Sequence, residues 1–267
     1  MFDPAALPPS LRLDRAGQVA VLSLSRARKR NALDDATVLG LGAFFAAPPG
    51  WARAVVLAAD GDHFSAGLDL GELRERDAVA GLHHSRMWHR AFGQIESCPV
   101  PVISVLKGAV VGGGLELACA THLRVAERSA FFALPEGERG LFTGGGASVR
   151  VPRLIGVARM TDLMLTGRVL AAAEAERYGL AQYLVDDGAG LDTALGLAAR
   201  TAENSPVTTY AVLHALPRIA QADPEAGLLL ESLMAAVAQD SGEAKRRMRA
   251  FLDGAAPKVA DPREAGR

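Results

Sequence analysis

The sequence predicts a layered α/β domain followed by an all-helical region. Buried-strand patterns alternate with helical patterns along the first 190 residues, and this alternation is typical of sheets covered by helices. After residue 190 the chain shows helical patterns only. We therefore divide the chain into an α/β core over residues 1–190 and a helical region over residues 191–267.

Each element has its own local signal. The run VAVLSL at 19–24 predicts a buried strand, and Asp34 or Asp35 after it predicts a helix start. In the helical region, the Ser-Pro pair at 205–206 and the Asp-Pro pair at 223–224 are typical helix starts, because serine or aspartate caps a helix and proline fits its first turn. The other predicted strands are 54–58, 101–106 and 122–126, and the other predicted helices are 78–95 and 113–121.

Composition and charge exclude several classes of protein. The chain has 267 residues, of which 49% are hydrophobic and 22% are charged, so it can bury a large core. Its 30 acidic and 29 basic residues give a net charge of −1, which predicts neither a nucleic-acid nor a membrane partner. Cys98 and Cys119 lie among apolar residues and indicate buried thiols in a reducing compartment. With no apolar run of about 18 residues and no signal-peptide pattern, we expect a soluble, cytoplasmic protein.

The most informative segment is a buried strand that leads into three consecutive glycines, Gly112 to Gly114, at the start of a helix. Glycine lets a ligand approach the backbone closely, and the first amides of a helix have no intrahelical partner. Such amides favour negative charge, so this turn can hold a developing oxyanion. The same glycines can also serve only to pack a strand against a helix.

Two glutamates lie in apolar surroundings near this turn. Glu116 is in the first turn of the predicted helix, and Glu136 follows an aromatic pair and Pro135. A buried carboxylate is costly unless it has a partner or a chemical role, and two such acids suit general acid–base chemistry on a water molecule. The ordinary alternatives are a helix-dipole role for Glu116 and a solvated loop position for Glu136. A further turn, at 62–70, can supply a second backbone amide.

Several motifs, in order, resemble those of the crotonases, the enoyl-CoA hydratase/isomerase family. The segment FSAGLDL at 64–70 is similar to the family motif F-(A/S)-A-G-x-D-(I/L). Residues 101–118 resemble P-V-I-A-x-V-x-G-x-x-x-G-G-G-x-E-L-A, and residues 132–146 resemble F-x-x-P-E-x-x-x-G-x-x-x-G-x-G. The segment RARKRNAL at 26–33 and landmarks at 155–180 match the same pattern. The resemblance implies a crotonase-like core, a repeated β-β-α spiral, with a C-terminal all-helical region.

The resemblance implies enoyl-CoA hydratase activity, the addition of water across the 2,3-double bond of an enoyl-CoA thioester. The backbone amides of Ala66 and Gly113 would form the oxyanion hole, and Glu116 and Glu136 would act on one water molecule. Acids at both positions are usual in the hydratases of the family, whereas an enoyl-CoA isomerase is the alternative. A non-catalytic acyl-CoA-binding homologue is a further alternative. No separate cofactor is implied, because CoA is part of the substrate.

The resemblance also implies a surface that binds the acyl-CoA thioester. Arg28 lies in the densest basic cluster and is our candidate for phosphate contact. Gly254 stands where the family usually has lysine or arginine, and Lys258 could substitute for it. We expect a homotrimer or a dimer of trimers, assembled through the helical region. The remaining residues expected to contact the substrate are Ser65, Gly67, Leu68, Asp69, Leu70, Gly112, Pro135 and Gly144.

Residue spacing argues against other kinds of site. His83, His84 and His89 do not place three nitrogens on one helical face, and no cysteine or acidic partner completes a zinc site. The dinucleotide fingerprint G-x-G-x-x-G does not fit Gly108 followed by the three glycines. The G-x-S-x-G nucleophile turn of hydrolases does not occur. We therefore predict no metal site and no dinucleotide cofactor.

Overall fold

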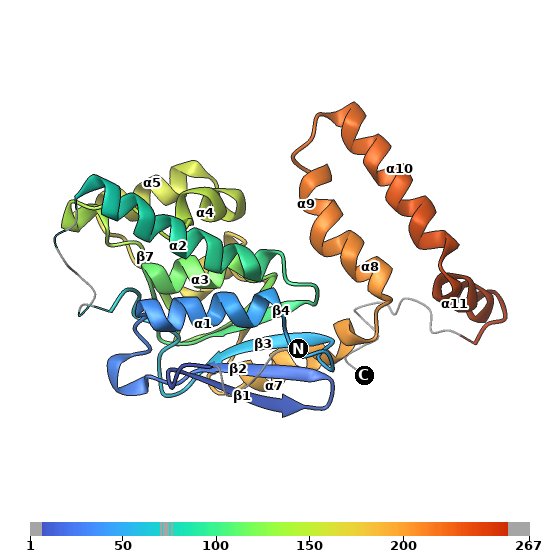
Figure 1. The fold of residues 1–267 in the computed structure, drawn as a ribbon, viewed down its shortest axis with the longest axis horizontal. Helices are drawn as coiled ribbons and strands as arrows, with labels where there is room; N and C mark the ends of the chain where they lie inside the picture. The colour runs from blue at the N-terminus through green and yellow to red at the C-terminus, as the bar shows by residue number, and fades with distance from the viewer. Residues whose placement is uncertain (1–6, 70, 72–74, 76, 256–267) are drawn as a thin grey trace. The chain divides into compact units, whose positions relative to one another are not determined.

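The computed structural model describes residues 7–69, 71, 75 and 77–255, which form two compact units that divide between Glu203 and Asn204 (Figure 1). The first unit is a layered α/β domain and the second is all-helical. The division falls later than the boundary predicted at residue 190, because helix α7 (Gly190–Ala202) packs against the sheet of the first unit. None of the helices in the described ranges has the length and apolar character that crossing a membrane requires.

A six-stranded sheet forms the centre of the first unit. Its strand order is β1-β2-β3-β4-β6-β9, in which β1 pairs antiparallel with β2 and all other neighbours are parallel. The sequence analysis did not predict β1, because its residues are mostly exposed and charged. The strands are β1 (Leu11–Ala16), β2 (Val19–Leu24), β3 (Ala54–Ala59), β4 (Val102–Leu106), β6 (Leu123–Glu127) and β9 (Tyr183–Val185).

A second, three-stranded sheet joins the segments that carry the predicted site. β5 (Ala109–Val111) pairs parallel with β7 (Phe131–Ala133), and β7 pairs antiparallel with β8 (Leu170–Ala171). Two strands followed by a helix recur as β1-β2-α1, β4-β5-α3 and β6-β7-α4, as the β-β-α repeat requires. The remaining helices of this unit are α1 (Asp35–Ala46), α2 (Ala78–Glu96), α3 (Gly113–Ala120), α4 (Ala147–Ile155), α5 (Val157–Thr166) and α6 (Ala172–Arg177), with 3-10 turns at Ala27–Lys29 and Gly137–Arg139.

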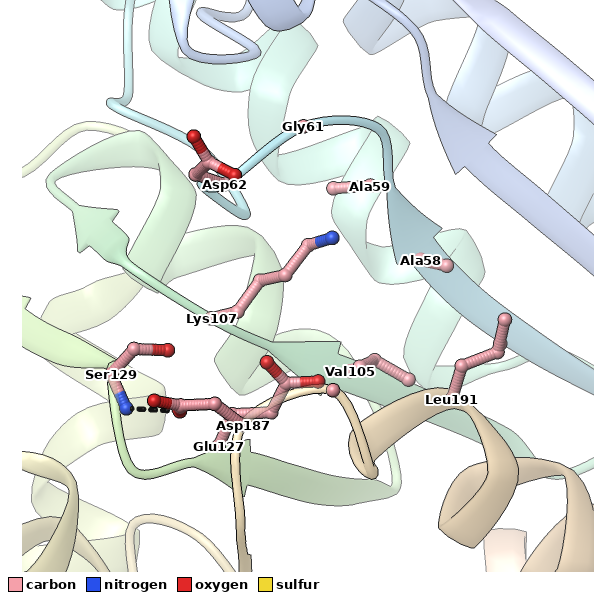
Figure 2. Close-up of a pocket in the computed structure, with 11 residues that line it drawn as sticks. Ala58, Ala59, Gly61, Asp62, Val105, Lys107, Glu127, Ser129, Asp187 and Leu191 are labelled. Carbon is pink, nitrogen blue, oxygen red and sulfur yellow. Dashed lines mark hydrogen bonds between the residues drawn. The ribbon is translucent and has the colours of Figure 1, made fainter.

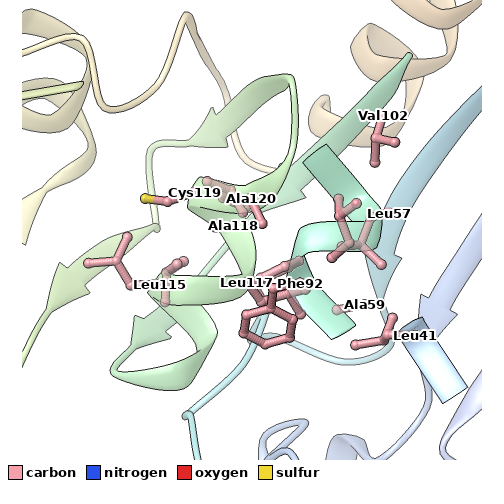
Figure 3. Close-up of a cluster of buried hydrophobic side chains, with 14 of the residues drawn as sticks. Leu41, Leu57, Ala59, Phe92, Val102, Leu115, Leu117, Ala118, Cys119 and Ala120 are labelled. Atoms are coloured by element: carbon pink, nitrogen blue, oxygen red, sulfur yellow. The ribbon is translucent and has the colours of Figure 1, made fainter. Parts of the chain in front are cut away.

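Apolar side chains on the two faces of the large sheet form two cores. On one face, Leu57 packs with Leu41 of α1 and Phe92 of α2, as Figure 3 shows. On the other face, Val56 belongs to a core with Leu197 of α7. Because successive side chains of a strand point to opposite faces, the fully buried runs of β2 and β3 supply both cores.

The second unit consists of helices whose starts match the predicted caps. The side chains of Ser205 and Asp223 accept hydrogen bonds from the backbone N–H groups of Thr208 and Ala226, respectively. Many large apolar side chains of this unit are exposed, among them Leu229. Such exposure suits a role in assembly, which stays a prediction. The helices are α8 (Pro206–Tyr210), a π-helical segment (Ala211–Ala215), α9 (Leu216–Ile219), α10 (Pro224–Asp240) and α11 (Gly242–Leu252).

Candidate active site

A cavity of about 1100 Å³ lies where the predicted motifs meet in the first unit. Both predicted acids, Glu116 and Glu136, line it, and so do Ala66 and Gly113. The cavity therefore joins segments that are far apart in the sequence. Leu70 was predicted as a contact but lies outside the described residues. The other predicted contacts that line the cavity are Gly67, Leu68, Asp69, Gly112, Pro135 and Gly144.

The glycines before and at the start of α3 are required by close approach of neighbouring groups. Gly112 has a φ of +52°, and a Cβ built on it would lie 2.8 Å from Oε1 of Glu136. A Cβ built on Gly113 would lie 2.7 Å from the ring of Trp88. No larger residue is therefore accommodated at either position without movement of its neighbours.

The backbone amide that lies beside Gly113 is that of Leu68, and the prediction for Ala66 is wrong. The Ala66 N–H donates to the carbonyl oxygen of Arg30 at 2.9 Å, so this N–H is already used. Within the described ranges, the N–H groups of Leu68 and Gly113 have no acceptor, and the Leu68 nitrogen lies 3.5 Å from a Cβ built on Gly113. Gly67, with a φ of +90°, changes the direction of the chain between Ala66 and Leu68 and gives their N–H groups different surroundings.

Two other predicted contacts, Ser65 and Arg28, do not line the cavity. Ser65 is fully buried, and its hydroxyl donates to a backbone carbonyl and accepts from the N–H of Gly67. Ser65 therefore shapes the turn and does not touch the cavity. Arg28 is exposed on the 3-10 turn, whereas its neighbours Lys29 and Arg30 line the cavity. The basic cluster thus reaches the cavity through Lys29 and Arg30, and the phosphate contact of Arg28 stays a prediction.

Glu116 is buried and oriented by the segment that enters α4. Its Oε1 accepts hydrogen bonds from the N–H groups of Gly145 at 2.8 Å and Ala147 at 3.0 Å. Burial raises the pKa of this carboxyl group, while the two N–H groups and Arg150 oppose the rise. The donors stabilise the negative charge of Glu116 despite its burial.

Glu136 has different surroundings. Its Oε2 is buried and has no hydrogen-bond partner within the described residues. Burial raises the pKa of the Glu136 carboxyl group, and the nearby charge of Glu116 raises it further. An unpaired buried carboxyl oxygen favours the protonated form and leaves room for a bound water. The two acids are therefore an unequal pair: the charged form of Glu116 is supported by two N–H donors, whereas Oε2 of Glu136 has no such donor in the described residues.

Asp69 ties the turn at 64–69 to the basic turn at 26–30. Its carboxylate accepts hydrogen bonds from the N–H of Gly71 at 3.0 Å, from Arg26 Nη2 at 2.5 Å and from Lys29 Nζ at 3.0 Å. The bond from Gly71 and the two cations hold the pKa of Asp69 far below its usual range, although burial opposes this. The cluster therefore fixes the turn that carries the Leu68 N–H.

Asp69→Asn should lower the free energy of unfolding at pH 7 by about 2–3 kcal/mol, because a neutral amide removes the buried negative charge that Arg26 and Lys29 share, and Arg26 keeps only its ion pair with Asp34. The native pKa of Asp69 is lowered, so its stabilisation is present above the ordinary value near 4 and is lost as the pH falls through the native value. Urea unfolding at pH 7 and pH 3 should show the difference from wild type shrinking at the lower pH. Asp186→Asn, which removes an exposed partner of Arg128, is the control with almost no expected effect. Equal losses in the two variants would contradict the role of Asp69.

The structure gives the α2 histidines and the cysteines separate environments. Nε2 of His84 lies 2.9 Å from Oδ1 of Asp35, while His89 is on the exposed part of the helix. In the described part of the chain, no group of three or more histidine, cysteine, aspartate or glutamate residues is placed to hold a metal ion. Cys98 and Cys119 are free and buried, and burial raises the pKa of both thiols to about 11.

A second cavity of about 540 Å³ lies at the carboxyl ends of β3, β4 and β6, and its wall includes Lys107 (Figure 2). Two of its acids have structural partners. Glu127 accepts a hydrogen bond from the N–H of Gly190 at 3.1 Å, and Asp187 accepts one from the N–H of Ser129 at 2.7 Å. These bonds fasten α7 and the loop before it to the sheet. None of the predicted site residues lines this cavity.

The sequence motifs did not identify one wall of the active-site cavity, which is a face of α2. The structure places Trp88 both in the core and on the cavity wall. The helical spacing i, i+3, i+4, i+7 could have revealed this face, although its residues are not uniformly apolar. The four residues of this wall are Gly81, His84, Ser85 and Trp88.

Comparisons with known proteins agree with this architecture. The family model for enoyl-CoA hydratase/isomerase matches residues 14–262. A short-chain-enoyl-CoA hydratase from Clostridium acetobutylicum is 29% identical over 244 residues, which span 90% of this chain and 94% of that protein. The crystal structure of a "putative enoyl-CoA hydratase" from Rhodopseudomonas palustris is 59% identical, with a TM-score of 0.90 over 94% of this chain and 96% of that one. A similarly described protein from Thermobifida fusca, in complex with CoA, is 25% identical, with a TM-score of 0.80 over 88% and 93%.

The order of the motifs and the recurring strand–strand–helix units agree with these matches, which extend over most of the chain. The first unit has the crotonase architecture that the sequence predicted. The chain belongs to the enoyl-CoA hydratase/isomerase family of the crotonase superfamily.

Proposed function

We propose that the protein is an enoyl-CoA hydratase, which adds water across the 2,3-double bond of an enoyl-CoA thioester. One observation carries the proposal: Glu116 and Glu136, two acids with unequal surroundings, line the same cavity as the open N–H groups of Leu68 and Gly113. The name of the Clostridium relative and the CoA bound to the Thermobifida protein support it.

The N–H groups of Leu68 and Gly113 would bind the thioester carbonyl oxygen. When water attacks Cβ, electron density moves onto this oxygen and produces an enolate-like oxyanion. Two backbone donors, one of them at the start of α3, stabilise that charge without having to reorganise. Loss of one such donor typically raises the barrier by about 3 kcal/mol.

The two carboxyl groups take opposite roles in this scheme. Glu116, whose charge is supported by two N–H donors, accepts a proton from water as the water oxygen bonds to Cβ. Glu136, which holds a proton readily, gives that proton to Cα. The product has gained one hydroxyl group and one hydrogen, and a proton transfer from Glu116 to Glu136 restores the starting state. Because the two groups are coupled, the titration of the site belongs to the pair.

Lys29 and Arg30 would contact the phosphates of CoA, in the role that the sequence analysis gave to Arg28. Both residues line the cavity, whereas Arg28 does not. Their positive charges suit phosphate, which accepts charge-assisted hydrogen bonds. Lys29 is also bonded to Asp69, so its position depends on the same cluster that fixes the turn of Leu68.

The protein should hydrate crotonyl-CoA to 3-hydroxybutyryl-CoA, measured by the loss of enoyl-thioester absorbance. The same assay with 3-hexenoyl-CoA separates the alternative, because an isomerase moves the double bond into conjugation and absorbance rises. Hydration faster than isomerisation supports the proposal. Isomerisation without hydration would assign the protein as an enoyl-CoA isomerase. Binding of CoA without either reaction, across thioesters of several chain lengths, would make it a non-catalytic homologue.

A further inference from the structure

We propose that the acyl part of the cavity selects acyl groups that carry a hydroxyl substituent, and that His84, oriented by Asp35, accepts the hydrogen bond from this hydroxyl. The inference rests on the proposed acyl-CoA function and names its substrate class.

One face of α2 forms this wall, with Gly81, His84, Ser85 and Trp88 at helical spacing. Gly81 leaves open space, because a Cβ built on it would meet no atom within 4 Å. The hydroxyl of Ser85 donates to the carbonyl oxygen of Gly144 at 2.6 Å and so joins the helix to the opposite loop. Two residues of the wall keep polar capacity: Trp88, whose buried Nε1–H donor has no partner in the described residues, and His84.

Asp35 sets the hydrogen-bonding character of His84. Oδ1 of Asp35, at the start of α1, lies 2.9 Å from Nε2 of His84, whose side chain is 19% exposed. The carboxylate accepts the Nε2–H, and in the tautomer that carries this hydrogen Nδ1 has a lone pair and is an acceptor. Nδ1 has no protein partner in the described ranges and is not among the fully buried unpaired atoms, so a ligand can reach it.

Trp88 stands between His84 and the catalytic turn. The six-membered ring of Trp88 would lie 2.7 Å from a Cβ on Gly113 and 3.0 Å from one on Gly145. The rings of His84 and Trp88 are 6.0 Å apart at an angle of 52°. The indole of Trp88 thus contacts the oxyanion turn and neighbours the ring of His84, and in this proposal the part of an acyl chain past Cβ runs along the wall that the two side chains form.

A hydroxyl is the substituent that this acceptor fits best. An alkyl chain packed against the wall would remove water from Nδ1 and leave it unpaired, which costs free energy. A hydroxyl donates to Nδ1 and restores the lost hydrogen bond. A carboxylate has no proton to donate to a neutral Nδ1, and the negative charge of Asp35 lies on the far side of the same ring.

The test uses saturated thioesters, because they cannot be hydrated and their binding reports recognition alone. Isothermal titration calorimetry would compare hexanoyl-CoA with 6-hydroxyhexanoyl-CoA, and the corresponding pairs with four and eight carbons. In at least one pair the hydroxylated member should bind wild type about tenfold more tightly. His84→Leu should remove this preference, chiefly by tightening the binding of the plain thioester, because leucine has no acceptor for an alkyl chain to desolvate. Asp35→Asn should reduce the preference, because the amide no longer fixes which ring nitrogen carries the proton.

His83→Leu is the matched control, since His83 is a neighbouring histidine of α2 that is exposed and does not line the cavity. It should keep the preference. Equal binding within every pair, or a preference that survives in His84→Leu, overturns the proposal. Tighter binding of adipoyl-CoA than of 6-hydroxyhexanoyl-CoA that is lost in His84→Leu also overturns it, because that result makes His84 a cation and not an acceptor. The comparison with His84→Leu is needed because Lys29, Arg30 and Arg139 also line the cavity. Selective binding without hydration of any enoyl thioester would refute the hydratase assignment alone, and hydration without selectivity would refute this inference alone.

Discussion

Glu116→Gln and Glu136→Gln should each lower kcat for hydration of crotonyl-CoA by roughly 10²- to 10⁴-fold. Glutamine keeps the shape of the side chain, and its oxygen can still accept the N–H groups of Gly145 and Ala147. It cannot take a proton from water at position 116 or give one to Cα at position 136. Because neither substitution touches the CoA-binding cations, the affinity for a saturated acyl-CoA should change little.

Steady-state kinetics and calorimetry with butyryl-CoA together test this prediction. Glu138→Gln is a suitable control, because Glu138 is two residues away, exposed and outside the cavity wall. Wild-type kcat in the Glu116 or the Glu136 variant would remove that residue from the mechanism. A variant that loses affinity but keeps kcat would show that the glutamate binds the thioester and does not transfer protons.

The fold was predictable where both faces of an element are buried. The runs VAVLSL and AVVLAA correspond to β2 and β3 within one residue, because apolar residues on every position leave few alternatives. β1 lacks that signal, since only Leu11 among its residues is buried. The predicted boundary fell before α7 because the apolar stripe of this helix resembles that of any surface helix. Only the packing in the structure reveals that α7 covers the sheet of the first unit.

The site was predictable where residue type carries the chemistry. Glu116 and Glu136 are identified by their carboxyl groups, and the structure places both on one cavity. The choice between Ala66 and Leu68 could not be made in this way, because every non-proline residue has the same N–H group. It depends on the backbone of Gly67, which has a φ of +90° and lies so close to the β5–α3 turn that a Cβ on it would be 2.6 Å from the carbonyl oxygen of Val111.

Gly113→Ala should lower kcat by roughly 10²- to 10³-fold, the effect expected for loss of an oxyanion donor. The added methyl group would lie 2.7 Å from the Trp88 ring and 3.5 Å from the Leu68 nitrogen, so it would occupy space beside both donors. Alanine is a good helix former, and Gly113 does not have a positive φ. The expected defect is therefore local to the site that binds the thioester carbonyl. Crotonyl-CoA kinetics should show the fall in kcat, and a thermal unfolding curve should show that the variant still folds.

Gly93→Ala on α2 is the matched control, because a Cβ there would meet no atom within 4 Å, and activity should be retained. If Gly113→Ala unfolds, adding Trp88→Leu removes the indole that the methyl group would strike while leaving the methyl beside the Leu68 N–H. The double variant should then fold and still hydrate poorly. A folded Gly113→Ala protein with wild-type kcat would mean that the thioester oxygen is bound elsewhere. Because the methyl and the oxyanion compete for the same space, recovery of activity in the double variant would equally contradict the proposed hole.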